Sequence, residues 1–277
     1  MSGCLILCGT PIGNLGDISE RAVQTLRDAD VIACEDTRRT RKLLTHLGLS
    51  PHELIVYNDA NQSRQGDKLV ARMRNGSQVV LVSDAGMPGL SDPGFKLVQT
   101  CIEQAVPVRV VPGPSAVVTA LSVSGLAPGR FIFEGFLPRK QGDRRRRIEG
   151  LATEQRTLVL FESPHRLETS VSDLLELLGD RRVALARELT KLHEEVRRSS
   201  LSELLESLRT EPARGEVVLI VEGAQRAVEG LPPSELAQRA RALMASGVER
   251  KMALTTVAKE TGVARRRVFD ALLEDAD

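Results

Sequence analysis

Residues 79–94 read VVLVSDAGMPGLSDPG and decide the fold class. Residues 79–82 are a continuous aliphatic run, which is typical of a strand buried on both faces of a sheet. The next twelve residues contain three glycines, two prolines and two aspartates, which is more than a simple connection needs. Ligands of open α/β sheets bind at the carboxyl ends of strands. We therefore expect a ligand site in this loop, although turns that cap the following helix are a competing interpretation.

The same kind of apolar run recurs along most of the chain. Short aliphatic runs, several of them continuous, occupy residues 5–8, 31–34, 54–57, 79–82, 108–111, 131–133, 158–161, 183–186 and 217–221. The segments with the apolar spacing of amphipathic helices are residues 19–28, 38–47, 62–74, 167–178 and 201–208. This alternation predicts an α/β architecture in which helices connect buried strands.

Two segments rich in proline and glycine divide this pattern. Residues 112–114 are Pro-Gly-Pro and residues 230–233 are Gly-Leu-Pro-Pro. Proline cannot continue a strand, and glycine permits a sharp turn. After the second segment the sequence has no strand signal. We therefore predict an α/β domain at residues 1–112, a second α/β domain at residues 113–229 and a small helical domain at residues 230–277.

Composition excludes several classes of protein. The net charge is +1, so a nucleic-acid partner would need a local basic cluster. Aromatic residues make up 3% of the chain, which predicts an aliphatic core. No apolar run approaches the roughly 20 residues that cross a bilayer, and the first residues lack the pattern of a signal peptide. We expect a cytoplasmic protein without membrane contact. The four cysteines and four histidines are too scattered for a metal site.

Other loops also follow predicted strands. The glycines of residues 9–16 fit neither a dinucleotide fingerprint nor a phosphate loop, so a tight strand-to-helix turn is the favoured interpretation. Ser115 and Ala116 begin a predicted helix whose free amides suit a carboxylate, although a rigid hinge explains this segment equally well. Residues 161–166 contain a serine and a histidine without a Gly-x-Ser-x-Gly motif, which disfavours a serine hydrolase.

Basic residues gather in two places. Residues 138–147 contain six cations and one acid, and such a run is either a phosphate contact or ordinary solvated surface. Residues 253–273 resemble a helix-turn-helix with its turn at Gly262, although a small structural cap is a competing interpretation. The candidate RNA contacts are Arg139, Lys140, Arg144, Arg145, Arg146, Arg147, Arg265, Arg266 and Arg267.

Seven motifs occur in a characteristic order. They are TPIGNLGDI at 10–18, EDTR at 35–38, SDAGMPGLSDPG at 83–94, PGPSA at 112–116, FESPHR at 161–166, RELTK at 187–191 and GE at 215–216. Together they resemble the tetrapyrrole-methylase superfamily of S-adenosylmethionine-dependent enzymes. Within it, the chain closely resembles the branch that methylates the ribose 2′ oxygen of a cytidine in bacterial small-subunit (16S) ribosomal RNA.

The resemblance implies two α/β domains that meet at a cleft, with the methyl donor S-adenosylmethionine held between them. It also implies a homodimer that acts on the small ribosomal subunit. Ser115 and Ala116 would receive the amino-acid end of the donor. The donor-site residues implied by the resemblance are Pro11, Asp84, Gly86, Met87, Ser91, Asp92, Ser115, Ala116, Phe161, Ala186 and Gly215.

Methyl transfer to a ribose hydroxyl benefits from a base and from a cation near the developing alkoxide. We hypothesise that Glu188 or Asp36 is the base and that Lys191 or Arg38 holds the alkoxide or a phosphate. Two other functions compete with RNA methylation: methylation of a corrinoid or tetrapyrrole precursor, and non-catalytic binding to the ribosome. The arginine-rich segments favour RNA methylation, because a tetrapyrrole needs neither of them.

Overall fold

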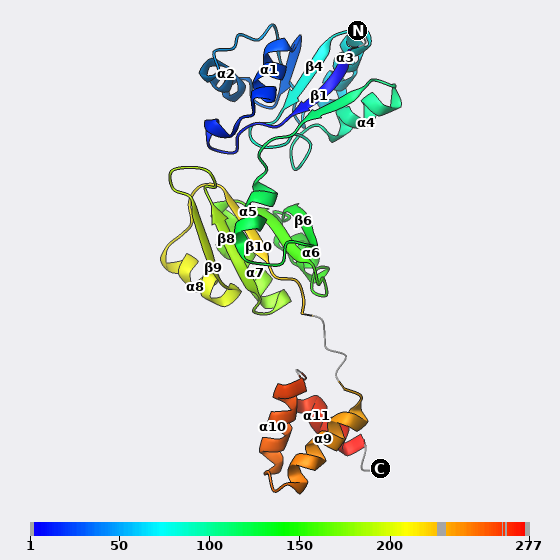
Figure 1. Ribbon diagram of the computed structural model, residues 1–277, viewed down its shortest axis with the longest axis vertical. Helices are drawn as coiled ribbons and strands as arrows, with labels where there is room; N and C mark the ends of the chain where they lie inside the picture. Colours follow the sequence, from blue (N-terminus) through cyan, green and yellow to red (C-terminus); the bar gives the residue numbers. More distant parts are fainter. Residues whose placement is uncertain (1–2, 226–230, 262, 264, 275–277) are drawn as a thin grey trace. The chain divides into compact units, whose positions relative to one another are not determined.

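The computed structural model describes residues 3–225, 231–261, 263 and 265–274 (Figure 1). The chain divides into two compact units, residues 1–223 and residues 224–277. The first unit contains two five-stranded sheets with helices, which confirms the predicted α/β class. Among the described residues, no helix is both long enough and apolar enough to span a membrane.

The first sheet is parallel throughout and has the strand order β3-β2-β4-β1-β5. Its strands are β1 (Cys4–Cys8), β2 (Val31–Cys34), β3 (Leu54–Val56), β4 (Gln78–Val82) and β5 (Val108–Val111). Parallel neighbours need crossover connections. These contain η1 (Leu15–Asp17), α1 (Glu20–Asp28), α2 (Thr37–His46), α3 (Gln62–Arg74) and α4 (Phe95–Glu103). The carboxyl ends of all five strands therefore meet at one edge.

Both faces of this sheet are buried, as the continuous apolar runs predict. In β1, Cys4, Ile6 and Cys8 pack into one apolar cluster, and Leu5 packs into the cluster on the opposite face. All four cysteines are buried and free. Burial raises the pKa of Cys8 and of Cys101 to about 11, so these thiols are protonated and serve packing.

The second sheet is mixed and has the strand order β6-β7-β10-β8-β9. Its strands are β6 (Phe131–Phe136), β7 (Thr157–Glu162), β8 (Arg182–Arg187), β9 (Glu195–Ser200) and β10 (Val217–Val221). Strand β10 runs antiparallel to both β7 and β8, and Val217 pairs with Glu162 on one side and Arg187 on the other. The ends of β7 and β8 therefore lie beside the start of β10. The helices of this part are α5 (Ala116–Ser124), α6 (Gln141–Glu149), α7 (Pro164–Leu178) and α8 (Leu201–Thr210).

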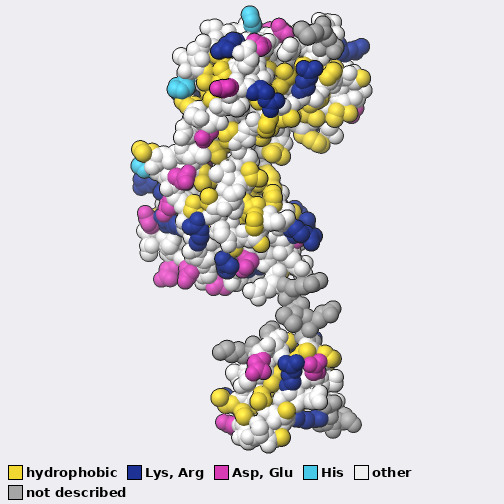
Figure 2. Space-filling view, in the orientation of Figure 1, with side chains coloured by type: hydrophobic (Ala, Val, Ile, Leu, Met, Phe, Trp, Pro, Cys, Tyr) yellow, Lys and Arg dark blue, Asp and Glu magenta, His cyan; other side chains and the backbone are white. Residues whose placement is uncertain are grey.

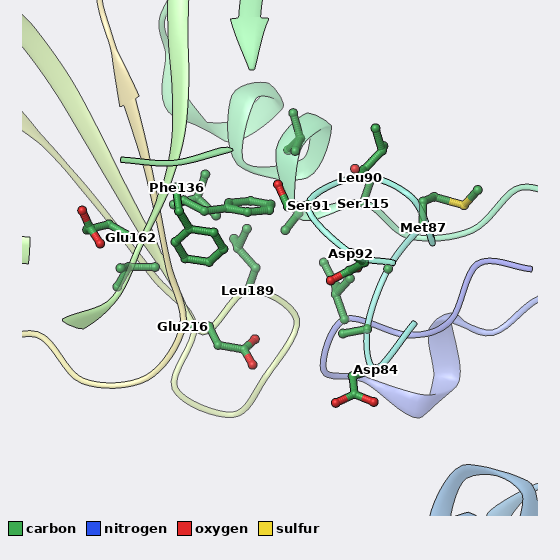
Figure 3. Close-up of a pocket in the computed structure, with 18 of the residues that line it drawn as sticks. Asp84, Met87, Leu90, Ser91, Asp92, Ser115, Phe136, Glu162, Leu189 and Glu216 are labelled. Carbon is green, nitrogen blue, oxygen red and sulfur yellow. The ribbon is translucent and has the colours of Figure 1, made fainter. Parts of the chain in front are cut away.

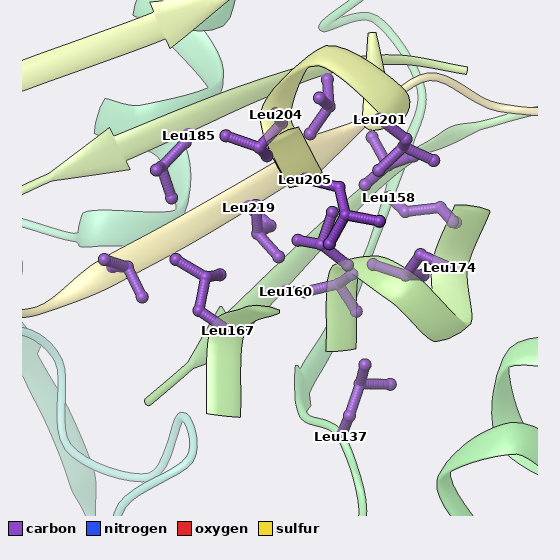
Figure 4. Close-up of a cluster of buried hydrophobic side chains, with 14 of the residues drawn as sticks. Leu137, Leu158, Leu160, Leu167, Leu174, Leu185, Leu201, Leu204, Leu205 and Leu219 are labelled. Carbon is purple, nitrogen blue, oxygen red and sulfur yellow. The ribbon is translucent and has the colours of Figure 1, made fainter. Parts of the chain in front are cut away.

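A leucine-rich core covers one face of this second sheet (Figure 4). Leu158 and Leu160 alternate with Val159 along β7, so their side chains share one face and meet leucines of α7 and α8. Each fully buried leucine contributes roughly 2 kcal/mol of transfer free energy. This aliphatic packing holds the sheet rigid behind the strand ends that carry polar residues.

The second unit contains α9 (Pro233–Ala245), α10 (Arg250–Thr261) and α11 (Arg265–Glu274). Apolar residues of the three helices form one core. The guanidinium of Arg250 lies 5.4 Å from the ring centroid of Phe269, a cation–π contact that joins α10 to α11. The predicted turn at Gly262 lies outside the described residues, as does Gly230 of the predicted domain boundary.

Candidate active site

A cavity of about 440 Å³ lies where the strand ends of the first sheet face those of the second sheet (Figure 3). The first sheet contributes Glu35 after β2 and Asp84 after β4. The second contributes residues at the ends of β7 and β8 and at the start of β10. The cavity is therefore built from both sheets of the first unit.

Most of the predicted donor-site residues line this cavity. They are Asp84, Gly86, Met87, Ser91, Asp92, Ser115, Ala116, Phe161, Ala186 and Gly215. Pro11 is buried but does not line it, and its neighbour Ile12 does. The placement brings residues from four distant motifs together with Ala186, while their contact with a donor stays a prediction.

The long loop of residues 83–94 is fixed by its pairing with the first loop of the chain. The amides of Thr10 and Gly86 each donate to the other's carbonyl, at 2.9 and 3.1 Å. Gly86 has a φ of 80°, which is accessible to glycine at little cost. Ser91 has a φ of 64°, an uncommon conformation for a residue with a side chain. The loop therefore presents backbone and short side chains to the cavity in a set conformation.

Asp84 is oriented by one group of the EDTR motif and by Arg39, which follows that motif. Its carboxylate accepts the backbone N–H of Asp36 at 3.2 Å, and its other oxygen lies 3.3 Å from a guanidinium nitrogen of Arg39. Both Arg39 and Asp84 line the cavity. This arrangement fixes a carboxylate at the cavity wall, where it can accept hydrogen bonds from hydroxyl or ammonium groups.

Two further carboxylates of the cavity, Glu35 and Asp92, have no ion pair with a described Lys or Arg side chain. Burial, together with the nearby charges of Glu35, Asp84 and Asp59, raises the pKa of Asp92 to about 6. Burial and the charges of Asp84 and Asp59 also raise the pKa of Glu35. Figure 3 shows the Asp92 side chain projecting from its loop toward Leu189. Asp92 can therefore exchange a proton near neutral pH.

The predicted catalytic residues lie outside the lining of this cavity. The Glu188 carboxylate accepts Lys191 Nζ at 2.9 Å and the Glu216 N–H at 2.8 Å. The backbone N–H of Glu216 and the ammonium of Lys191 hold the pKa of Glu188 below its usual value. Asp36 pairs with Arg38 at 2.9 Å, and this guanidinium lowers the pKa of Asp36 to about 2.

These ion pairs disfavour Glu188 and Asp36 as the base, and the assignment of the base stays a prediction. A carboxylate with a lowered pKa is a weak proton acceptor, and neither Glu188 nor Asp36 faces the cavity. Lys191 and Arg38 are each paired with an acid, so their charges are compensated locally. The RELTK motif instead joins loops of the two sheets, because Thr190 Oγ1 accepts the N–H of Asn14 at 3.1 Å.

Glu162 is a buried structural acid of the same cavity wall. Its carboxylate accepts Arg166 at 2.9 Å, the Ser170 hydroxyl at 2.6 Å and the Ser163 N–H at 2.7 Å. Arg166 also donates to the Leu137 carbonyl at 2.8 Å. The FESPHR motif is therefore a hydrogen-bonded brace that positions the end of β7.

Sequence analysis did not assign several lining residues to the cavity. Glu35 and Glu162 belong to quoted motifs, which is a signal that could have included them. Aliphatic residues carry no such signal. The lining residues that were not predicted are Ile12, Glu35, Arg39, Ala85, Leu90, Val117, Phe136, Glu162, Ser163, Pro164, Leu189, Glu216, Val217 and Val218.

Residues 5–205 match the family model of the tetrapyrrole (corrin/porphyrin) methylases. This chain belongs to the tetrapyrrole methylase family. The resemblance inferred from the motifs is thereby confirmed.

Curated relatives of this tetrapyrrole methylase carry one recurring name, "Ribosomal RNA small subunit methyltransferase I". A Synechocystis protein of that name is 43% identical over 276 residues, which are 98% of this chain and 98% of the relative. The Escherichia coli O157:H7 protein is 42% identical over 98% of this chain and 95% of its own length. The Thermotoga maritima protein is 45% identical over 223 residues, which are 80% of this chain and all of the relative.

Solved structures of tetrapyrrole methylase folds align with this chain at lower identity. A Thermus thermophilus uroporphyrin-III C-methyltransferase complexed with S-adenyl homocysteine is 23% identical, with a TM-score of 0.57 over 79% of this chain and 97% of that one. A diphthine synthase is 16% identical, with a TM-score of 0.60 over 80% of this chain and 90% of that one. These likenesses establish the fold.

The predicted basic run of this tetrapyrrole methylase is largely paired with acids. Arg144 is buried on α6 and lies 2.7 Å from Asp173 of α7, so it serves packing, and we withdraw it as an RNA contact. Arg145 lies 3.0 Å from Asp173, and Arg147 pairs with Glu134. Figure 2 shows basic and acidic side chains interspersed on this face of the first unit.

The basic residues that stay open to solvent are a smaller set. The side chain of Arg146 is 79% exposed, although it pairs with Asp143 of its own helix. Residues without a described ion pair to an acid have the highest capacity for phosphate. The other exposed candidates are Arg139, Lys140, Arg147, Arg265, Arg266 and Arg267. Among them, Arg147 pairs with Glu134 and Arg266 lies 4.0 Å from Asp270.

Proposed function

We propose that this chain transfers a methyl group from S-adenosylmethionine to the 2′ oxygen of a cytidine ribose in small-subunit (16S) ribosomal RNA. The observation that carries this proposal is the match over nearly the whole chain to relatives named ribosomal RNA small subunit methyltransferase I. The cavity supports it, because its residues come from the same motifs and suit a cationic donor.

The residues of the cavity fit the donor in three respects. Its volume of about 440 Å³ lies within the range of small-molecule sites. Five carboxylates line it, and two of them, Glu35 and Asp92, have no ion pair with a described cation and favour a positively charged ligand. Ser115, the N-cap of α5, makes no side-chain capping bond, so its hydroxyl and the first helix amides are available to a carboxylate. We assign the amino-acid end of the donor to this helix start.

When bound, the donor supplies a methyl group on a cationic sulfur, which needs no metal for transfer. The chain must then align the ribose and accept the proton of its 2′ hydroxyl. We assign this proton to the Asp92 carboxylate, which lines the cavity and has no ion pair to a described cation. Burial, together with the like charges of Glu35 and Asp84, raises the pKa of Asp92 and keeps this carboxylate basic.

The RNA contacts that we propose are the exposed basic residues of both units. Arg139, Lys140 and Arg146 lie between β6 and α6 or on α6, and Arg265–Arg267 begin α11. Phosphate contacts of this kind position RNA without reading its sequence. We further infer that the chain works as a homodimer in the cytoplasm, with functional domains at residues 1–112, 113–229 and 230–277.

Transfer of labelled methyl groups tests this function. Purified full-length chain is incubated with labelled S-adenosylmethionine and either small ribosomal subunits that lack the modification or a uroporphyrinogen-type tetrapyrrole. We expect label in the RNA and none in the tetrapyrrole. Label in the tetrapyrrole alone would identify a small-molecule methylase. Absence of donor binding in calorimetry would favour a non-catalytic ribosome-binding protein.

A further inference from the structure

Phe136 is an exposed aromatic residue in a chain with few aromatics. The chain has six phenylalanines, one tyrosine and no tryptophan. Phe136 ends β6, lines the cavity and is 58% exposed. Single exposed apolar side chains are common on protein surfaces, so exposure alone assigns no role to this ring. Its position in the cavity points to a ligand.

A β-bulge turns this ring toward the cavity. Phe133 pairs with Val159 and Gly135 pairs with Leu160, so Glu134 is skipped in the register. Side chains alternate between the faces of a strand, and a skipped residue reverses the alternation that follows. Phe136 therefore lies on the same face as Phe133 rather than on the face of the leucine core. Gly135 permits the bulge with a φ of 65°.

The ring of Phe136 is supported from behind by other aromatics. Its centroid lies 5.6 Å from that of Phe161, which lies 4.9 Å from that of Phe133 in an edge-to-face arrangement. Such contacts hold the rings without covering the outer surface of Phe136. Figure 3 shows Phe136 across the cavity from Asp84, Met87 and Asp92. The wall that holds Phe136 also holds Glu162 and Glu216, and the facing loop carries Asp84 and Asp92.

We propose that Phe136 is the stacking platform for the nucleobase of the target nucleotide in RNA. This inference rests on the proposed function, which requires a ribose inside the cavity. A base removed from its stack is commonly held by stacking on an aromatic side chain. The exposed Arg139 and Lys140 follow Phe136 by only three and four residues, where they can hold the adjoining phosphates. Because these cations lie close to Phe136, an RNA base is favoured over the adenine of the donor as the group that stacks on its ring.

The test compares Phe136→Leu with Phe136→Tyr in the full-length chain. Leucine keeps apolar volume without a ring, whereas tyrosine keeps the ring. Phe95→Leu is the matched control, because Phe95 is 65% exposed and does not line the cavity. The measurements are single-turnover methylation of small subunits over a range of subunit concentrations, donor affinity by calorimetry without RNA, and thermal unfolding.

Stacking on one aromatic side chain corresponds to a factor of about 5 to 150 in binding. We expect Phe136→Leu to raise, by that factor, the subunit concentration that gives half of the maximal rate. Donor affinity and thermal unfolding should stay unchanged. Phe136→Tyr should recover most of the loss, and Phe95→Leu should behave as wild type. Wild-type rates with Phe136→Leu would overturn the inference. An equal loss of donor affinity would also overturn it, because the ring would then bind the donor's adenine. Absence of transfer by the wild-type chain would overturn the proposed function itself.

Discussion

Replacing Asp92 by asparagine should stabilise the protein and abolish most of its methyl transfer. At neutral pH the wild-type carboxylate is ionised although it is partly buried beside Glu35 and Asp84. Its pKa of about 6 compares with 3.8 for a free aspartate. A shift of this size corresponds to about 3 kcal/mol without screening, and solvent screening of a partly exposed group reduces it to about 1 kcal/mol. We expect Asp92→Asn to gain about 1 kcal/mol at neutral pH.

The stability gain of Asp92→Asn over wild type depends on pH in one direction only. Because the folded pKa of Asp92 is above the unfolded value, the folded state binds more protons between those values. The wild-type free energy of unfolding therefore falls, relative to the variant, as pH rises from about 4 to about 6. Above that range the difference is constant. Urea unfolding of both proteins at a series of pH values measures it.

The methyl-transfer rate of Asp92→Asn should fall although its stability rises. Loss of a general base lowers rates by about 100-fold or more, so Asp92→Asn should lose at least that factor at saturating donor. In the wild type, the ionised fraction of a group with a pKa of about 6 changes about tenfold between roughly pH 7 and pH 5. Single-turnover rates should fall by that factor in acid.

Asp67→Asn on α3 is the control, because Asp67 is exposed and does not line the cavity. It should leave the rate and its pH profile as in wild type. A flat wild-type profile, or an Asp92→Asn rate restored by more donor, would refute the assignment of the proton to Asp92. A variant that is less stable than wild type at neutral pH would refute the electrostatic reasoning.

Four other substitutions separate structural from functional residues. Arg144→Ala should lose about 1–3 kcal/mol in urea unfolding, because buried Asp173 loses one of its two guanidinium partners and keeps Arg145. Arg146→Ala should keep stability but weaken RNA binding and flatten its salt dependence. Glu188→Gln should lower single-turnover rates by less than about tenfold, since its carboxylate lies outside the cavity lining and a true base would cost about 100-fold or more. Gly215→Ala should cost about 1–3 kcal/mol of unfolding free energy, because a Cβ at its φ of 82° would strain the backbone and press on Glu188.

Much of the fold could be predicted because its strands are buried on both faces. Continuous apolar runs mark β2 and β10, which are buried throughout, at the residues where the structure has them. Strand β9 was missed because its sequence, EVRRSS, is mostly polar and it forms an edge of the second sheet. Helix α6 was not predicted because four successive arginines conceal its apolar spacing.

The residues that line the cavity could be predicted better than the ion pairs and side-chain orientations around it. Loop motifs at strand ends identify the residues that share an edge, because topology brings those ends together. Ion pairing cannot be derived from spacing: nothing in the sequence indicates that Arg144 meets Asp173, or that Lys191 meets Glu188. The orientation of Phe136 depends on the β-bulge at Glu134. The bulge places Phe136 on the face of the sheet opposite to the one that simple alternation predicts.

Nucleoside analysis of the RNA tests the central claim most directly. Small subunits that lack the modification are treated with the full-length chain and a methyl donor carrying deuterium, and the 16S RNA is digested to nucleosides for mass spectrometry. We predict a single labelled product, cytidine methylated on the ribose 2′ oxygen. Label on a nucleobase, or no label when the donor binds the cavity, would contradict the account.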